Sequence, residues 1–251
     1  MAERKKDKKK GFGKLLDAWV PPRDAGMPVG CVATSFTFSS SFFEEECLSR
    51  FLSLETDPTE DGPLYLIERE EKLSQVICAC AVVDQHHCKG PRSLRWDLLP
   101  ARVPAAILHA KVSLLVWSNM VRVLIASANL TEDGYRRNLE VFATFDYRDG
   151  GECPNRLLQE IVGFIGICAD RSQAVDQSAS PALARVHALL DKTRGIPSDW
   201  GVSEEESLNK GVGAYAVLVG PNRPHALNAL SRLWPGHYPP IDAHVVSPFF
   251  D

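Results

Sequence analysis

The 251-residue sequence contains no apolar run of the roughly 20 residues that a helix needs to cross a bilayer. Its charged beginning is not followed by an apolar segment, so we expect no secretory signal peptide. It also lacks the heptads, collagen-like periodicity and repeats of fibrous or array proteins. With 45% hydrophobic and 24% charged residues, the composition is typical of a soluble globular protein. The length predicts one large domain, or one domain and part of a second.

Common zinc-binding spacings are also missing. Cys78, Cys80, His86, His87 and Cys88 lie close together, but their spacing matches no common zinc module, and we interpret them as core cysteines followed by a loop. The seven cysteines are odd in number, and several lie in apolar runs, where a free cysteine behaves as a small buried hydrophobe. We therefore expect a reducing compartment, the cytoplasm, and neither a metal nor a cofactor.

Charge is distributed unevenly. Residues 1–14 carry seven basic and two acidic side chains, a net charge of +5, while the rest of the chain carries −9. We expect residues 1–22 to form a basic disordered tail. It is interpreted either as a contact for nucleic acid or an anionic surface, as a nuclear-import signal in a eukaryote, or as a solvated terminus.

Hydrophobic patterning predicts strands that alternate with helices. The expected strands are 30–38, 64–67, 75–83, 106–117, 121–128, 140–145, 214–219 and 242–246. The expected helices are 42–54, 154–169, 181–192 and 223–234, the first capped by one of the serines 39–41. Residues 86–97 and 198–213 are expected to be a loop and a polar linker. This alternation predicts an α/β sandwich with a mixed central β-sheet.

The segment around His109 carries the first candidate functional residues. Alternation along a strand places His109, Lys111 and Ser113 on one face, with Leu108 and Val112 on the other. A histidine and a lysine side by side would be costly in an ordinary core, but they suit a cleft that binds an anion. Lysine supplies positive charge for a phosphate, and imidazole can act as a nucleophile or carry a proton. The alternative is a satisfied core histidine beside a lysine that extends to solvent.

The next two expected strands carry three more polar residues. A turn at Ser118–Met120 returns the chain so that Ser127 and Asn129 lie beside His109 and Lys111. Asn129 could donate to a non-bridging phosphate oxygen, as the donors of an oxyanion hole do. Glu140 begins an otherwise apolar strand and could orient the imidazole of a histidine. As alternatives, Ser127 stabilises a turn, and Glu140 pairs with a nearby arginine.

Together these residues resemble one half-motif of the phospholipase D superfamily. The resemblance covers residues 105–145: His109-x-Lys111, Ser127-x-Asn129-Leu130-Thr131, Gly134 and Asn138-x-Glu140. It implies two such halves in each active site, with one histidine attacking phosphorus and the other protonating the leaving group. Lysine and asparagine would stabilise the phosphorane, and no metal is implied. His109, Lys111, Asn129 and Glu140 are thus the predicted catalytic residues, and Ser127 and Ser113 the predicted substrate contacts.

Two departures from the usual motif bear on the substrate. Val116 stands where the family usually has Asp, and 20 residues separate His109 from Asn129. Both features resemble the tyrosyl-DNA phosphodiesterase branch, whereas the Glu140 pattern resembles bacterial nuclease-type members. The resemblance therefore implies a phosphodiesterase that acts on DNA or RNA through a phosphohistidine. The alternatives are a phospholipase or phosphatidyltransferase, and a catalytically incomplete half-domain that binds nucleic acid.

The sequence has only one complete half-motif. His87-x-Lys89 lies in a polar loop without its own Ser-x-Asn strand, and we interpret it as coincidence. The second half-site is therefore expected from a homodimer or from a missing second half-domain. The expected organisation is a phospholipase D-like half-domain over residues 23–195, then a linker and the beginning of a related half over 196–251. The 245–251 segment supports this organisation, because it echoes the strand-serine-paired-Phe pattern that begins near Val32.

Overall fold

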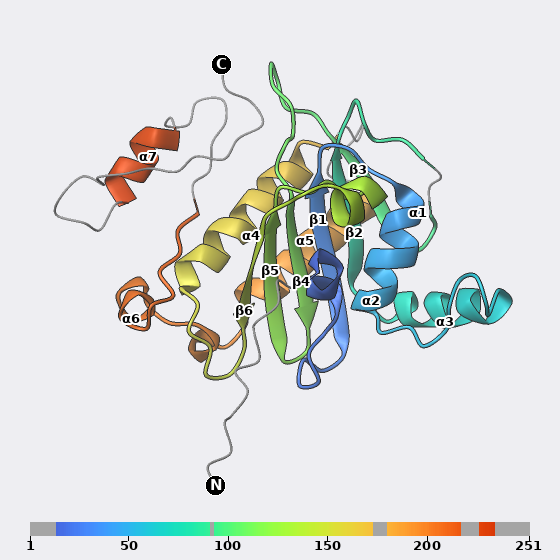
Figure 1. Ribbon diagram of the computed structural model, residues 1–251, viewed down its shortest axis with the longest axis horizontal. Coiled ribbons are helices and arrows are strands. Elements are labelled where there is room, and N and C mark those ends of the chain that lie inside the picture. The colour runs from blue at the N-terminus through green and yellow to red at the C-terminus, as the bar shows by residue number, and fades with distance from the viewer. Residues whose placement is uncertain (1–13, 91–92, 173–179, 217–225, 234–251) are drawn as a thin grey trace, which may run out of the picture. The chain divides into compact units, whose positions relative to one another are not determined.

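A six-stranded mixed sheet forms the centre of the computed structural model, which describes residues 14–90, 93–172, 180–216 and 226–233. The strand order is β3-β2-β1-β4-β5-β6 (Figure 1). β1, β2 and β3 are parallel, whereas β4 is antiparallel to β1, and β5 and β6 continue the antiparallel half. The strands are β1 (Pro28–Ser35), β2 (Cys78–Asp84), β3 (Asp97–Ala101), β4 (Val112–Trp117), β5 (Met120–Ala126) and β6 (Phe142–Tyr147).

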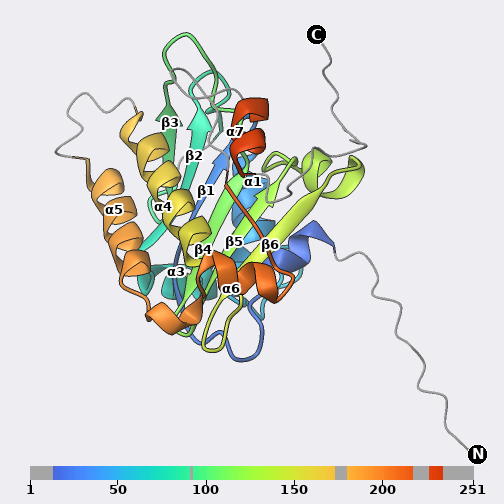
Figure 2. The same ribbon diagram turned by 90° about the vertical axis from the view of Figure 1, so that its left-hand side faces the viewer.

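Helices cover both faces of this sheet. α4 (Asn155–Asp170) and α5 (Pro181–Arg194) pack side by side against the parallel strands (Figure 2). The opposite face carries a continuous helical run, α1 (Ser40–Phe42), η2 (Phe43–Leu48) and α2 (Ser49–Phe51), with η1 (Leu15–Trp19) against it. The predicted α/β sandwich with a mixed central sheet is confirmed. The other helices that the structure describes before residue 214 are α3 (Pro63–Ser74), η3 (Asp133–Arg137), η5 (Ser198–Trp200) and α6 (Glu204–Asn209).

Strand alternation assigns the apolar side chains to the two layers. Cys31 and Ala33 of β1 face the helical run, where they join a buried aromatic cluster that includes Trp19, Phe43 and Trp117. Gly30, on the other face, lies so close to Leu189 of α5 that a methyl group there would collide with it. All seven cysteines are free, and five are buried. Thiols therefore fill core positions, as the apolar runs predicted.

Three local predictions were wrong. Residues 64–67 belong to helix α3, which begins with Pro63, a residue preorganised for a first helical turn, and is braced by a Lys72–Glu68 pair at 2.9 Å. Strand β3 was read as part of a loop, because an edge strand with a proline gives a weak signal. The strands expected at 106 and 140 begin only at Val112 and Phe142. Consequently, His109, Lys111 and Glu140 lie on the segments that lead into strands.

The chain divides into two compact units after Ala214. In the second unit the structure describes helix α7 (Ala226–Leu233), which agrees with the helix expected at 223–234. The expected strand at 242–246, the second half of the one at 214–219 and the basic segment of residues 1–13 lie outside the described residues. No helix in the described part of the chain combines the length and apolar character that crossing a bilayer requires.

Candidate active site

One edge of the sheet gathers all the predicted site residues. The carboxyl ends of parallel strands β1 and β2 lie at this edge, next to the beginning of β4, the end of β5 and the beginning of β6. β1 is also where the sheet changes from parallel to antiparallel pairing. In open α/β sheets, ligands bind outside the carboxyl ends of strands where the strand order reverses. The topology therefore puts polar residues from five strand ends at a position suited to a ligand.

His109 and Lys111 contact each other directly. Lys111 Nζ lies 2.9 Å from Nδ1 and 3.0 Å from Nε2 of His109, and it also donates to the His109 carbonyl oxygen at 2.9 Å. The imidazole is exposed, whereas Lys111 is 8% exposed. Thr34 of β1 positions this segment, since its hydroxyl accepts from Val112 N and donates to the carbonyl oxygen of Ala110, both at 3.0 Å. The pair thus presents a nucleophilic ring in front of a buried cation.

The electrostatics of the pair favour a neutral ring beside a charged amine at pH 7. Partial desolvation, and secondly the charge of Lys111, lower the pKa of His109 below its ordinary 6.5. Desolvation also lowers the pKa of Lys111 to about 8, although the negative charge of Glu140 acts in the opposite direction. Near pH 7 most imidazoles therefore have a free lone pair and most Lys111 amines carry a proton. This combination suits attack on an anionic phosphoryl group.

Asn129 follows the end of β5, and its amide orientation is determined by backbone donors. Its Oδ1 accepts from Phe36 N at 3.1 Å and Thr37 N at 3.2 Å, with Ser35 Oγ at 3.4 Å. An N–H group can only donate, so the oxygen of the amide must face the end of β1. The NH2 group therefore faces away from these donors, with two protons available for a ligand.

Two small residues hold Asn129 in place. Ser35 Oγ accepts from Leu130 N at 3.0 Å and donates to the Thr37 carbonyl oxygen at 2.6 Å, which joins the end of β1 to the residue after Asn129. Gly134 packs so closely against the backbone of Asn129 that a Cβ atom would overlap its carbonyl oxygen. Gly134 was one of the residues that carried the family resemblance, and this contact gives a physical reason for a glycine there.

Ser127 and Glu140 bind each other. The hydroxyl of Ser127 donates to Glu140 Oε2 and accepts from Val141 N at 3.0 Å. Asn138 Nδ2 lies 3.4 Å from the other carboxylate oxygen. Within the described residues, Glu140 makes no hydrogen bond to His109, and its electrostatic effect is felt by Lys111. The predicted role of Glu140 in orienting the imidazole stays a prediction, as does a substrate contact by Ser127.

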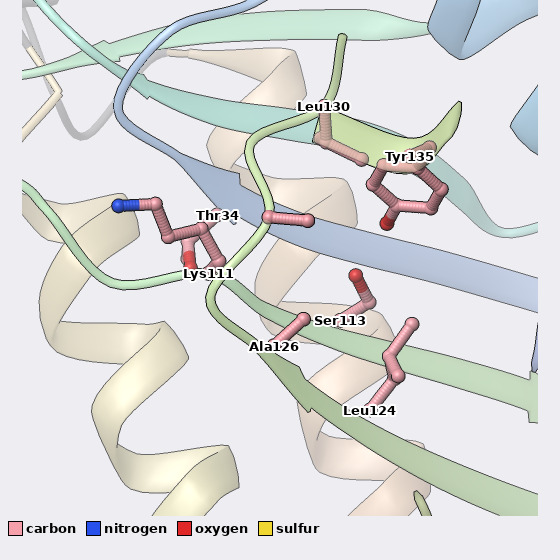
Figure 3. A pocket seen from close by; sticks show the side chains of 8 residues that line it. Thr34, Lys111, Ser113, Leu124, Ala126, Leu130 and Tyr135 are labelled. Carbon is pink, nitrogen blue, oxygen red and sulfur yellow. The ribbon is translucent and has the colours of Figure 1, made fainter. Parts of the chain in front are cut away.

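Ser113 lies behind Lys111 in a narrow crevice. The crevice is formed by β1, β4, β5 and the segment after β5, and its lining includes Thr34, Lys111, Ser113 and Tyr135. Figure 3 shows the amine of Lys111 pointing away from Tyr135, with Ser113 between the strands. Ser113 is 4% exposed, so a ligand at Lys111 would meet the amine before it met this hydroxyl. A substrate contact by Ser113 stays a prediction.

Sequence analysis did not connect Phe36, His87 or Asp84 with the segment that bears His109. Phe36 packs its ring against His109, with centroids 5.0 Å apart, and against His87, with centroids 4.3 Å apart. The buried carboxylate of Asp84 accepts from Leu108 N at 2.9 Å, immediately before His109. An acid that ends an apolar strand was a usable signal for Asp84. The proximity of Phe36 and His87 has no counterpart in local sequence.

His86, His87 and Cys88 lie in the turn after β2, as the loop prediction required. Among the residues that the structure describes, no group of three or more histidine, cysteine or acidic side chains is arranged to hold a metal ion.

Comparisons with known proteins give structural neighbours only. No family model matches the chain, and no curated protein matches it. Similar solved structures include yeast tyrosyl-DNA phosphodiesterase, with 13% identity and a TM-score of 0.41 over 71% of this chain. Two mutants of the yeast enzyme give 11% identity with a TM-score of 0.41 over 68%, and 12% with 0.40 over 71%. This chain spans 36% of the length of each of these structures.

Proposed function

We propose that the chain is a metal-independent phosphodiesterase of the phospholipase D type that cleaves nucleic acid through a phosphohistidine. The observation that carries this proposal is the contact between His109 and buried Lys111. Phe36 links this pair to Asn129, because its ring packs on His109 and its backbone N–H donates to Asn129 Oδ1. In the proposed reaction, Nε2 of His109 attacks phosphorus in line with the leaving oxygen. The P–N bond forms as the P–O bond breaks, and Lys111 and Asn129 stabilise the equatorial oxygens.

Substrate binding would also free the nucleophile. Lys111 donates towards the ring of His109. A phosphoryl oxygen carries negative charge and would compete for the same amine, because an ammonium is attracted more strongly to an anion than to a neutral imidazole. The ring nitrogen would then face phosphorus. Water then attacks phosphorus, and a P–O bond forms as the P–N bond breaks, which regenerates neutral His109. The proton that water loses passes to the group that earlier protonated the leaving oxygen.

The leaving oxygen needs a proton that neutral His109 cannot supply. We propose that a second half-site provides it, either from a second copy of the chain or from a longer form of it. Residues 23–195 would then form one half-domain, and residues 196–251 the linker and the beginning of the related half. Nucleic acid is favoured as substrate because the departures of the half-motif resemble the tyrosyl-DNA phosphodiesterase branch. The finer choice between a nuclease and a tyrosyl-DNA phosphodiesterase is part of the same test.

The test uses single-stranded DNA with a 3′-phosphotyrosyl group, the same DNA without it, and phosphatidylcholine vesicles, all in excess EDTA. We expect cleavage of DNA by the wild type and by His187→Ala, which removes an exposed histidine on α5 that pairs with Asp170. His109→Ala should be inactive. A rate that rises with the square of protein concentration would identify a dimeric site.

Other outcomes would redirect the proposal. Cleavage of lipid but not DNA would establish a phospholipase. DNA binding without cleavage at any protein concentration would leave a binding half-domain, and loss of activity in EDTA would contradict the metal-independent mechanism.

A further inference from the structure

We propose that Asp84 is a positioning residue, whose carboxylate ties the segment that bears His109 to the turn that bears His86 and His87. The proposal rests on the proposed function only where activity is measured. Its other measurements concern the geometry of the site and need no substrate.

The first observation is that the Asp84 carboxylate is buried, which is unfavourable for a charged group. Asp84 ends the buried strand β2 and is 1% exposed. An ionised carboxylate at such a depth is unfavourable unless hydrogen bonds compensate for lost hydration. Three donors do so: Leu108 N at 2.9 Å, His86 N at 3.0 Å and His86 Nδ1 at 3.0 Å. The pKa of Asp84 is lowered despite burial, because these bonds outweigh desolvation.

The second observation is where the donors lie. Oδ2 binds the residue immediately before His109, and Oδ1 binds the residue immediately before His87. In the described part of these segments, residues 85–90, 93–96 and 102–111, no strand pairing joins one to the other, since they lie between the named strands. The oxygens of one carboxylate therefore bridge two irregular segments at the edge of the site.

The third observation is that the bridged segments meet again on Phe36. His87 and His109 both pack against its ring, at 4.3 and 5.0 Å between centroids. The contacts thus close a ring from Asp84 through Leu108, His109, Phe36 and His87 back to Asp84. In a closed arrangement, a shift on one side moves the imidazole of His109 relative to Lys111. Misplacement of a reacting group by about 1 Å can lower a rate about 100-fold.

The direct test is Asp84→Asn, which keeps the shape of the side chain and one acceptor oxygen. The other oxygen is replaced by an NH2 group, so the neutral side chain cannot accept hydrogen bonds from both segments. Phe36 shifts the ring protons of His87 and His109 in a proton–carbon NMR spectrum, with signals assigned through His87→Gln and His109→Gln. In Asp84→Asn we expect the ring-proton chemical shifts of both histidines to move towards those of a solvent-exposed histidine. The Leu108 amide should lose its protection from hydrogen exchange. If the proposed activity is present, kcat should fall about 10- to 100-fold with a smaller change in KM.

The matched control is Asp146→Asn. Asp146 accepts two hydrogen bonds from Arg122 between β5 and β6, at 2.7 and 2.8 Å. Its loss should lower stability while the His87 and His109 signals stay in place. Unchanged ring signals in a folded Asp84→Asn chain, or equal movement in the control, would overturn the proposal. A chain without any phosphodiesterase activity would refute the proposed function and leave this result standing.

A second variant covers the case in which Asp84→Asn does not fold. His86→Ala removes one donor on a mostly exposed side chain and leaves the carboxylate in place. The His87 signals should then move while the Leu108 amide remains protected. His87 signals that do not respond would contradict the proposed link through Oδ1.

Discussion

Asn129 Oδ1 lies 3.1 Å from the backbone nitrogen of Phe36, a residue 93 positions away in the sequence. This hydrogen bond orients the amide of Asn129, and with it the NH2 group that we assign to the phosphoryl oxygens. The acceptor and donor of one side chain therefore have separable roles, one in stability and one in the proposed reaction.

Two substitutions of Asn129 should separate these roles. Asn129→Ala leaves the amides of Phe36 and Thr37 without their acceptor and should lower the free energy of unfolding by about 1–3 kcal/mol. Asn129→Asp keeps an acceptor but removes both protons and adds negative charge. The denaturant midpoint of Asn129→Asp should lie near that of the wild type, whereas its activity should fall about 100-fold or more. An active Asn129→Asp chain would contradict the proposed role of the amide donor.

Lys111→Met should make the protein more stable and inactive. The pKa of Lys111 is about 8 in the folded chain and 10.5 ordinarily, so the unfolded state holds this proton more tightly. Folding therefore carries a penalty that is fully present below about pH 8 and fades as the pH rises towards 10.5. The free energy of unfolding of the variant, measured with urea at pH 7, should exceed that of the wild type by about 1–3 kcal/mol, and this difference should disappear at high pH. Destabilisation at pH 7 would show that the amine is not penalised by burial.

The pH–rate profile should be bell-shaped, and Glu140→Gln should move its alkaline limb. The acid limb reflects protonation of His109 and should lie below pH 6.5, whereas the alkaline limb reflects loss of the Lys111 proton near pH 8. The charge of Glu140 partly opposes the effect of desolvation on Lys111. Its removal should move the alkaline limb to lower pH and leave the acid limb in place. Movement of the acid limb alone would instead support contact between Glu140 and the imidazole.

Gly134→Ala should destabilise the protein, because the added methyl group would overlap the backbone of Asn129. We expect a loss of about 1–3 kcal/mol in thermal or urea unfolding, together with reduced activity. Gly163→Ala is the matched control, since a methyl group on that residue of α4 meets open space. In a helix interior, glycine-to-alanine substitution should raise the free energy of unfolding by about 0.5–1 kcal/mol. Equal effects of the two substitutions would exclude the proposed packing of Gly134 on Asn129.

Sequence patterning was sufficient for the larger elements. The apolar runs at β1, β2, β4 and β5 and the amphipathic stretches at α4 and α5 have the lengths and periods of their elements, so the α/β sandwich followed from local physics. Local signals failed where an element depends on its neighbours. β3 exists because β2 offers it a parallel partner. α3 is a different case, because the proline that begins it was a local signal for a helix that the apolar residues 64–67 obscured.

The candidate site divides in the same way. His109, Lys111, Asn129 and Glu140 were predicted from the sequence, because polar residues beside apolar strands are costly in an ordinary core and because their order resembles the half-motif. Their arrangement depends on tertiary contacts: Asn129 turns its NH2 group outward because Phe36 and Thr37 occupy its oxygen. Glu140 meets Ser127 because β5 pairs with β6. The packing of Phe36 on His109 joins residues 73 positions apart. Sequence alone thus determined which groups are present and which strands they lie next to. Only the packed sheet decided which groups meet, because contacts between distant segments are created when strand ends converge on one edge.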